Sequence, residues 1–134
     1  WEGRGMSNRI YIVCISGTRE KLQMAAMVAS VAAASGDSVS VFFSMNALPY
    51  FVKGRSADAP VEGEFGTLLA KKGVPRFKHL FHQAAELGDA QLLPCSMAVD
   101  LMELSEGELD AEFGPPTGLT RFLSDAEGGQ LLTF

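Results

Sequence analysis

The pattern that most constrains the fold is a strand, a helix and a second strand near the start of the chain. Residues 10–15, IYIVCI, are a β-branched and aromatic run typical of a strand buried on both faces. The alanine-rich stretch 19–35 has its apolar residues at helical spacing, and Gly36 stands where a glycine often ends a helix. Residues 38–43, SVSVFF, form the next apolar run. This order favours parallel pairing of the two strands with a right-handed crossover.

The remaining sequence continues the alternation of strands and helices. We expect a short helical segment at 45–51 and a surface loop at 53–66. Later helices are expected at 77–88, 97–104 and 117–126, with strands at 90–93 and 130–134 and a fifth around 111–113. The helix 77–88 would bury one apolar stripe, formed by Phe77, Leu80, Phe81, Ala84 and Leu87. These elements predict a three-layer α/β sandwich of the flavodoxin-like kind, a mostly parallel sheet of about five strands with helices on both faces.

The length and composition fit one self-sufficient domain. The chain has 134 residues, of which 47% are hydrophobic and 20% charged, so its core needs no disulfide or metal to hold it together. We expect residues 9–134 to form this single domain and residues 1–8 to be a flexible N-terminal extension or residues foreign to the natural protein. No apolar run approaches the roughly 20 residues of a membrane span.

The two cysteines, Cys14 and Cys95, stand far apart in a chain without a CxxC or Cys/His cluster. This pattern argues against zinc fingers, iron–sulfur clusters and disulfide scaffolds, and it favours a reducing, cytoplasmic setting. His79 and His82 fall off the apolar stripe of their helix, so we expect them to face solvent. The sequence therefore predicts neither a metal site nor a cofactor.

Charge is distributed unevenly along the chain. Residues 1–85 carry ten Lys and Arg against six Asp and Glu, whereas residues 86–134 carry one basic and ten acidic residues. A nucleic-acid binder needs a continuous basic face, so we expect no direct nucleic-acid contact. The basic cluster, Lys71, Lys72, Arg76 and Lys78, is either a solvated helix flank or a docking patch for an acidic partner or an anion.

Three segments follow predicted strands at the edge where parallel sheets place their working sites. They are Ser16-Gly17-Thr18, Ser44-Met45-Asn46 and Pro94-Cys95-Ser96. Cys95 is expected to be an exposed thiol at a turn from strand to helix, where free backbone N–H groups and the helix dipole favour the thiolate. The alternative is a cysteine that packs under a loop. Cys14 lies within an apolar strand and is expected to be a core residue.

The residues after Cys95 do not fit several other cysteine chemistries. A tyrosine-phosphatase loop needs an arginine six residues after the cysteine, where this chain has Leu101. A rhodanese loop needs a cation about five residues after it, where Asp100 stands. No Gly-x-Ser-x-Gly elbow of a serine hydrolase occurs in the sequence.

Three segments of the chain are similar to a known family. They are IVCISGT at 12–18, VFF with NAL at 41–48, and LPCSMAVDLMEL at 93–104. Together they resemble the DsrE/DsrF-like sulfur-relay family, in the same order and over nearly the whole chain from Arg9 onward. In the cysteine segment, Glu103 stands where the family usually has glycine.

The resemblance implies a sulfur carrier or sulfurtransferase that holds sulfane sulfur as a persulfide on Cys95 and passes it to a partner thiol, rather than an ordinary turnover enzyme. Backbone N–H groups of Ser96 and Met97 would steady the persulfide. The residues expected around it are Met45, Asn46, Ser16, Gly17 and Thr18. The resemblance also implies sulfur-donor and sulfur-acceptor proteins as partners, no cofactor, and a homo-oligomer, either a trimer or a hexamer.

Two other functions stay open from the sequence. The turn Ser16-Gly17-Thr18 resembles a phosphate-binding loop of flavodoxin-like proteins, which would make the chain a nucleotide- or flavin-binding module. Alternatively, the chain is a non-catalytic oligomeric subunit in which Cys95 is inert.

Overall fold

The computed structural model describes residues 8–56, 58–71 and 73–134. The expected N-terminal extension therefore lies outside the described residues apart from Asn8, whose carbonyl accepts the Ser38 N–H at 2.9 Å. The elements in chain order are β1 (Arg9–Cys14), α1 (Arg19–Ala34), β2 (Ser38–Phe43), a 3-10 helix (Met45–Phe51), α2 (Glu64–Leu68), α3 (Phe77–Gly88), β3 (Gln91–Pro94), α4 (Ser96–Leu101), α5 (Leu119–Asp125) and β4 (Gln130–Thr133).

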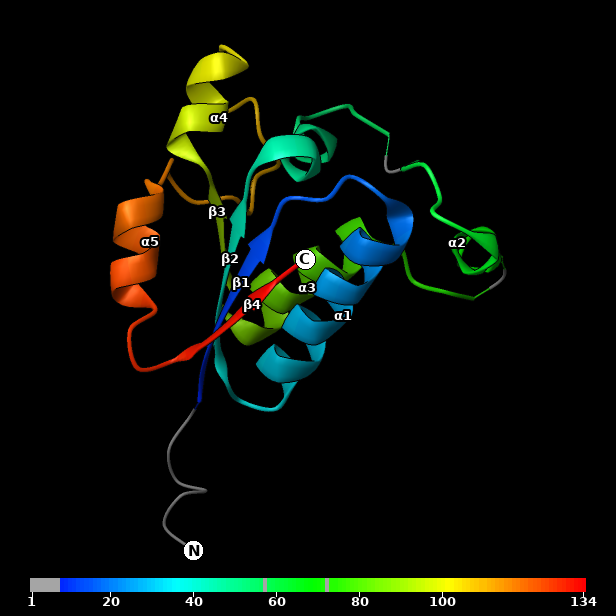
Figure 1. Ribbon diagram of the computed structural model, residues 1–134, viewed down its shortest axis with the longest axis horizontal. Coiled ribbons are helices and arrows are strands. Elements are labelled where there is room, and N and C mark those ends of the chain that lie inside the picture. Colours follow the sequence, from blue (N-terminus) through cyan, green and yellow to red (C-terminus); the bar gives the residue numbers. More distant parts are fainter. Residues whose placement is uncertain (1–7, 57, 72) are drawn as a thin grey trace, which may run out of the picture.

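The strands form one parallel sheet in the order β3-β2-β1-β4. Helices α1 and α3 pack on one face, α5 lies on the other, and α4 extends beyond the carboxyl ends of the strands (Figure 1). The predicted class, an α/β fold with a parallel sheet and helices on both faces, is confirmed. Strands that follow one another in the chain are joined by segments that contain helices, because a tight turn reverses the chain direction and cannot join parallel strands.

The fifth strand expected around residues 111–113 is wrong. Instead, an irregular segment runs beside β3 and makes two isolated parallel bridges, Leu92 with Phe113 and Cys95 with Thr117. Pro115 and Pro116 lie between these bridges and have no N–H to donate, so the segment does not continue as a regular strand. The sheet therefore has four strands.

The larger part of the core lies between the sheet and the pair α1 and α3. One face of the strands buries the large apolar side chains Ile12, Val41, Phe43 and Leu92. The alanine face of α1, with Ala25, Ala26 and Ala29 fully buried, packs onto this surface. Small side chains allow the helix to lie close to the sheet, as the alanine-rich sequence predicts.

The last turn of α3 differs from the predicted stripe. Leu87 is 83% exposed, whereas Phe77, Phe81 and Ala84 are buried as expected. Gly88 is the residue of this turn that faces α1. A Cβ added to Gly88 would lie only 2.5 Å from the Cβ of Ala33, too close for any side chain. The glycine thus permits close contact between the two helices.

Helix α2 (Glu64–Leu68) begins inside the segment 53–66, for which the sequence predicts only a surface loop, and ends just beyond that segment. Its start is held by the carboxylate of Glu20 in α1, which accepts the backbone N–H of Glu62 at 2.9 Å and of Gly63 at 2.8 Å. These hydrogen bonds, above all that from Glu62, hold the pKa of Glu20 below its usual value. The anchor is a tertiary contact, so no local pattern in the sequence predicts it.

Candidate functional site

Cys95 lies where β3 ends and α4 begins, as the sequence predicts. Its backbone is still extended, with φ −63° and ψ 125°, and it forms the N-cap position of α4. The Cys95 N–H donates to the carbonyl of Phe43 in β2 at 2.8 Å. This bond holds the residue at the carboxyl edge of the sheet, beside the end of β2.

The strand register gives the direction of the Cys95 side chain. Phe43 pairs with Pro94, and Phe43 packs against Phe81 of α3 with ring centroids 4.9 Å apart. Side chains alternate between the two faces of a strand. The next pair, Ser44 and Cys95, therefore points to the opposite face, the one that carries α5.

The Cys95 thiol is buried, which corrects the expectation of an exposed thiol and agrees with the alternative, a cysteine that packs under a loop. The residue is 5% exposed, because the segment 113–117 lies along the outer edge of β3. Gly114 N–H donates to the Leu92 carbonyl at 2.8 Å, and Thr117 N–H donates to the Pro94 carbonyl at 2.9 Å. A reagent or partner reaches the sulfur only through this covering segment or the small surface that it leaves.

The residues expected to steady an anion on Cys95 differ in their availability. The backbone N–H of Ser96 donates to the Thr117 carbonyl at 2.9 Å, so the expectation that it is free for a ligand is wrong. Met97 follows in the first turn of α4, and its side chain is exposed. On the β2 side, Met45 is exposed with φ 52°, a backbone conformation that is uncommon outside glycine. Of the expected residues, Ser96 and Met97 follow Cys95 directly along the chain, and Met45 lies just after β2, the strand that pairs with β3.

The segment Ser16-Gly17-Thr18 follows β1, which is separated from β3 and Cys95 by β2. The hydroxyl of Thr18 donates to the carboxylate of Glu62, and the Gly17 carbonyl accepts the hydroxyl of Tyr50 at 3.0 Å. Asn46 joins the two loops, because its N–H donates to the Ile15 carbonyl at 3.1 Å.

The start of α1 is poorly suited to a phosphate. The carboxylates of Glu20 and Glu62 lie beside it, the first bound to the backbone of the 62–63 loop and the second to Thr18. Negative side chains at this end of the helix oppose a second anion. This arrangement disfavours the nucleotide- or flavin-binding alternative.

Ser44 belongs to one of the three segments that the sequence places at the working edge of the sheet, but it is not among the residues that the sequence predicts around the persulfide. It is 3% exposed, and it directly follows Phe43 as Cys95 directly follows Pro94, the register partner of Phe43. The signal was present in the alternation of β2, because Ser44 shares its face with Phe42, which packs on Phe122 of α5 with ring centroids 5.1 Å apart. Since Phe42 is buried on this face, the alternation predicts that the Ser44 hydroxyl is buried there too.

Cys14 is a core residue, as its position in an apolar strand predicts. It is fully buried on the face of the sheet that packs against α1, and both cysteines are free. Burial away from water raises the pKa of the Cys14 thiol to about 12. The thiol is therefore protonated at every physiological pH.

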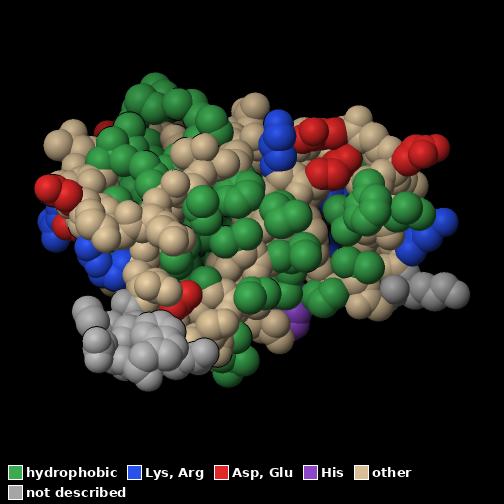
Figure 2. Space-filling model, turned by 60° about the horizontal axis from the view of Figure 1, so that its bottom comes forward, with side chains coloured by type: hydrophobic (Ala, Val, Ile, Leu, Met, Phe, Trp, Pro, Cys, Tyr) green, Lys and Arg blue, Asp and Glu red, His purple; other side chains and the backbone are tan. Residues whose placement is uncertain are grey.

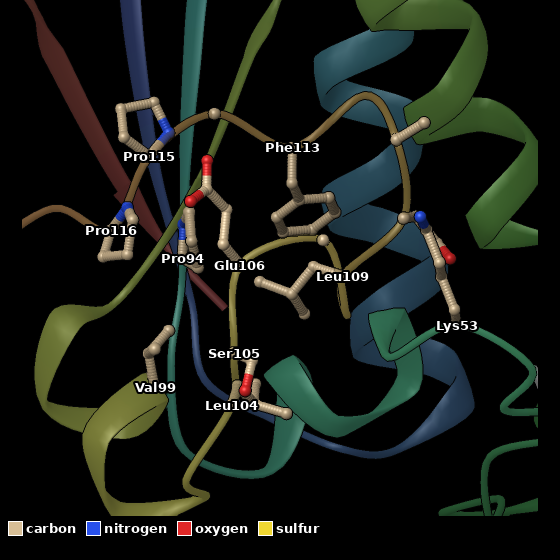
Figure 3. A pocket seen from close by; sticks show the side chains of 14 residues that line it. Lys53, Pro94, Val99, Leu104, Ser105, Glu106, Leu109, Phe113, Pro115 and Pro116 are labelled. Atoms are coloured by element: carbon tan, nitrogen blue, oxygen red, sulfur yellow. The ribbon is translucent and has the colours of Figure 1, made fainter.

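A cavity of about 530 Å³ opens beside the Cys95 segment. Val99 of α4, Pro94 of β3 and the side chains of Leu109 and Phe113 surround it (Figure 3). Lys53, Glu106 and Asp110 add charge to its lining. Within the described part of the chain, Cys95 does not line this cavity, because Pro94 points toward it and the alternation turns Cys95 to the other face.

The basic cluster near α3 does not form a continuous free patch. Arg76 pairs with Asp58 at 3.0 Å, and Lys78 pairs with Asp110 at 3.2 Å. Lys72 lies outside the described residues. Of the two histidines, His82 lies between the carboxylates of Glu86 and Glu112, at 3.0 and 3.4 Å.

Comparison with known proteins now identifies the family. The sequence model of the DsrE/DsrF/DrsH-like family matches residues 63–134, which is more than half of the chain and includes Cys95. The chain belongs to this family. A crystal structure of the ychN protein from E. coli has a similar fold, with a TM-score of 0.68 at 14% identity, covering 96% of this chain and 100% of that one. A search of curated proteins finds no match.

Membership of the DsrE/DsrF/DrsH-like family points to sulfur relay in general, and members of this family generally work with partner proteins. No helix in the described ranges is long and apolar enough to cross a membrane.

The backbone conformation of Glu103 agrees with the resemblance, which leads us to expect glycine at this position. Glu103 has φ 54°, in the left-handed region where a side chain is strained and glycine is favoured. It follows α4 and begins the loop that lines the cavity. Glycine, the residue that the resemblance leads us to expect at this position, would adopt this backbone conformation without strain.

Proposed function

We propose that this protein is a sulfur carrier or sulfurtransferase that holds sulfane sulfur as a persulfide on Cys95 and relays it to the thiol of a partner protein. The observation that carries the proposal is the position of Cys95. It lies in the segment 93–104 that resembles the cysteine segment of the family, at the carboxyl edge of a parallel sheet and directly before a helix. Cys14 is buried in the core and protonated, which leaves Cys95 as the candidate thiol.

The proposed transfer is a sequence of two thiol exchanges. The Cys95 thiolate attacks the outer sulfur of a donor persulfide, so that a bond from Sγ to that sulfur forms while the sulfur–sulfur bond of the donor breaks. The donor leaves as a thiolate. An acceptor thiolate then attacks the outer sulfur on Cys95 and releases the Cys95 thiolate. The sulfane sulfur moves without any external oxidant or reductant.

The negative charge around α4 favours partner proteins with a positively charged surface. Exposed acidic residues lie on α4 and on the loop after it, among them Asp100, Glu103 and Glu106. Basic surfaces are attracted to such a region, and this raises the rate of encounter. We propose donor and acceptor proteins with cationic docking surfaces, in a reducing compartment such as the cytoplasm, where both cysteines stay free.

Loading of sulfur tests the proposal directly. The reduced protein is incubated with polysulfide, and separately with a persulfidated carrier protein, and its intact mass is then measured. We expect the wild type and Cys14→Ala to gain sulfur that dithiothreitol removes, and Cys95→Ser to gain none. Sulfur that persists in Cys95→Ser, or an unmodified wild type, would contradict the proposal.

We further propose that the protein forms a homo-oligomer, a trimer or a hexamer, through the outer face of α1. Met24, Met27 and Val31 are exposed there at helical spacing, with Val28 between them. Figure 2 shows hydrophobic side chains gathered across the middle of the face where α1 lies. An exposed apolar stripe of this kind marks a surface that another protein covers.

A charge on this stripe should prevent assembly. For the wild type, light scattering should give three or six times the monomer mass of 14.3 kDa. The double change Met27→Glu with Val31→Glu should give the monomer, because burial of two unpaired carboxylates is strongly unfavourable. Leu87→Glu, at the exposed end of α3, is the control and should leave the mass unchanged. A monomeric wild type, or a double variant with the wild-type mass, would contradict this interface.

A further inference from the structure

Ser44 presents an unusual polar group beside the cysteine. Among the residues that the structure describes, its hydroxyl is the buried side-chain polar group without a hydrogen-bond partner. The residue is 3% exposed, so water does not replace the missing partner freely. Folded proteins avoid such groups, because a buried hydroxyl loses its hydrogen bonds to water. The unpartnered hydroxyl therefore indicates a group that arrives during function.

The neighbour of this hydroxyl across the sheet is Cys95. Ser44 follows Phe43 in β2 as Cys95 follows Pro94 in β3, and Phe43 and Pro94 are aligned. The backbone of Ser44 is extended, with φ −146° and ψ 177°, so its side chain lies on the face opposite to Phe43. Adjacent strands lie about 5 Å apart, which places the two side chains next to each other on the same face.

A second sulfur on Cys95 would bring an acceptor nearer to the hydroxyl. In the reduced protein the Ser44 hydroxyl makes no hydrogen bond to the Cys95 sulfur. The outer sulfur of a persulfide lies about 2 Å beyond Sγ, the length of a sulfur–sulfur bond. When this outer sulfur is ionised, it is an acceptor without a proton, and hydrogen bonds to charged groups are the stronger ones.

We propose that the Ser44 hydroxyl donates a hydrogen bond to the outer sulfur of a persulfide on Cys95 and so retains the sulfur until a partner thiol takes it. The inference rests on the proposed function. Ser44 keeps its proton throughout and forms no covalent bond. The role of the residue is to hold the persulfide anion within the protein, where the covering segment 113–117 limits access of small thiols.

The lifetime of the persulfide tests this role. Wild type, Ser44→Ala and Ser40→Ala are loaded with polysulfide, freed of excess reagent and exposed to a small thiol, and the fraction that keeps its added sulfur is followed by intact mass. We expect Ser44→Ala to lose sulfur about tenfold faster than the wild type, the effect of losing a hydrogen bond to a charged group.

Ser40→Ala is the matched control. Ser40 lies in β2, which Ser44 directly follows, and it is on the same face. It is also buried, and its hydroxyl donates to the side-chain oxygen of Gln91 at 3.4 Å. This variant should keep the wild-type lifetime. Ser44→Thr, which retains a hydroxyl, should restore most of the lifetime lost in Ser44→Ala, and thermal unfolding should show that each variant is folded.

The outcomes separate the inference from the function on which it rests. A wild type that never gains sulfur overturns both. A wild type that gains sulfur, with an equal lifetime in Ser44→Ala, overturns only the role of Ser44. A shortened lifetime in Ser40→Ala as well would assign the effect to strand β2 in general and overturn the specific hydrogen bond.

Discussion

Phe43→Ala is expected to destabilise the protein by about 3–5 kcal/mol, the usual range for truncation of a fully buried phenylalanine. The Phe43 side chain is fully buried. Its ring lies 4.6 Å from the ring of Phe51, 4.9 Å from Phe81 and 5.1 Å from Phe113, measured between centroids. Removal of the ring leaves a cavity whose walls come from β2, the 3-10 helix, α3 and the segment beside β3, and these elements cannot all move inward together.

Urea unfolding followed by circular dichroism measures this effect. The midpoint should fall by about 2 M with an unchanged slope, because the slope reflects the surface exposed on unfolding. Phe65→Ala is the matched control, since Phe65 in α2 is 68% exposed. This change should alter stability by less than about 0.5 kcal/mol. Equal midpoints for the two variants would mean that the aromatic cluster does not hold the sheet to α3.

The cluster also connects stability with the candidate site. The carbonyl of Phe43 accepts the N–H of Cys95, and Ser44 directly follows Phe43, the last residue of β2. A shift of β2 caused by the lost ring would therefore move both the cysteine and the hydroxyl beside it. We infer that the aromatic core serves the site by fixing the register between β2 and β3 at their carboxyl ends.

The elements that the sequence predicts well are those with a strong local period. The apolar run 10–15 and the alanine-rich stretch 19–35 correspond to β1 and α1 within one residue at each end. Each of these elements buries apolar side chains against elements that are close to it in the chain, so a local run of residues is enough to predict it. The position of Cys95 between a strand and a helix follows from the same kind of signal.

The features that the sequence does not predict depend on contacts between distant segments. Helix α2 begins where Glu20 binds the backbone of residues 62 and 63, more than 40 positions away. The burial of Cys95 results from the segment 113–117, which lies about 20 residues later and contains two prolines. Neither pairing leaves a periodic signal, so the sequence predicts neither helix α2 nor the burial of the Cys95 thiol.

The two cysteines are expected to differ strongly in their reactivity toward an alkylating reagent. Burial raises the pKa of Cys14 from 9.0 to about 12. Because each pKa unit changes the thiolate population tenfold, Cys14 has about a thousandfold less thiolate at neutral pH than an ordinary thiol. Iodoacetamide reacts with the thiolate, so Cys14 should stay unmodified in the folded protein, and labelling should occur at Cys95, which a small reagent reaches through the surface that the segment 113–117 leaves.

The sign of the pH dependence follows from the same cause. A raised pKa means that the Cys14 thiolate forms in the folded state only as the pH approaches 12, so labelling of Cys14 should stay negligible between pH 7 and pH 10. Peptide mapping by mass spectrometry measures the two sites separately. In guanidinium chloride both cysteines should be labelled, and Cys14→Ala should leave the labelling of Cys95 unchanged. Equal labelling of the two cysteines in the folded protein would show that the β1 strand opens as readily as the segment over Cys95, and a thiol in β1 would then compete for sulfur.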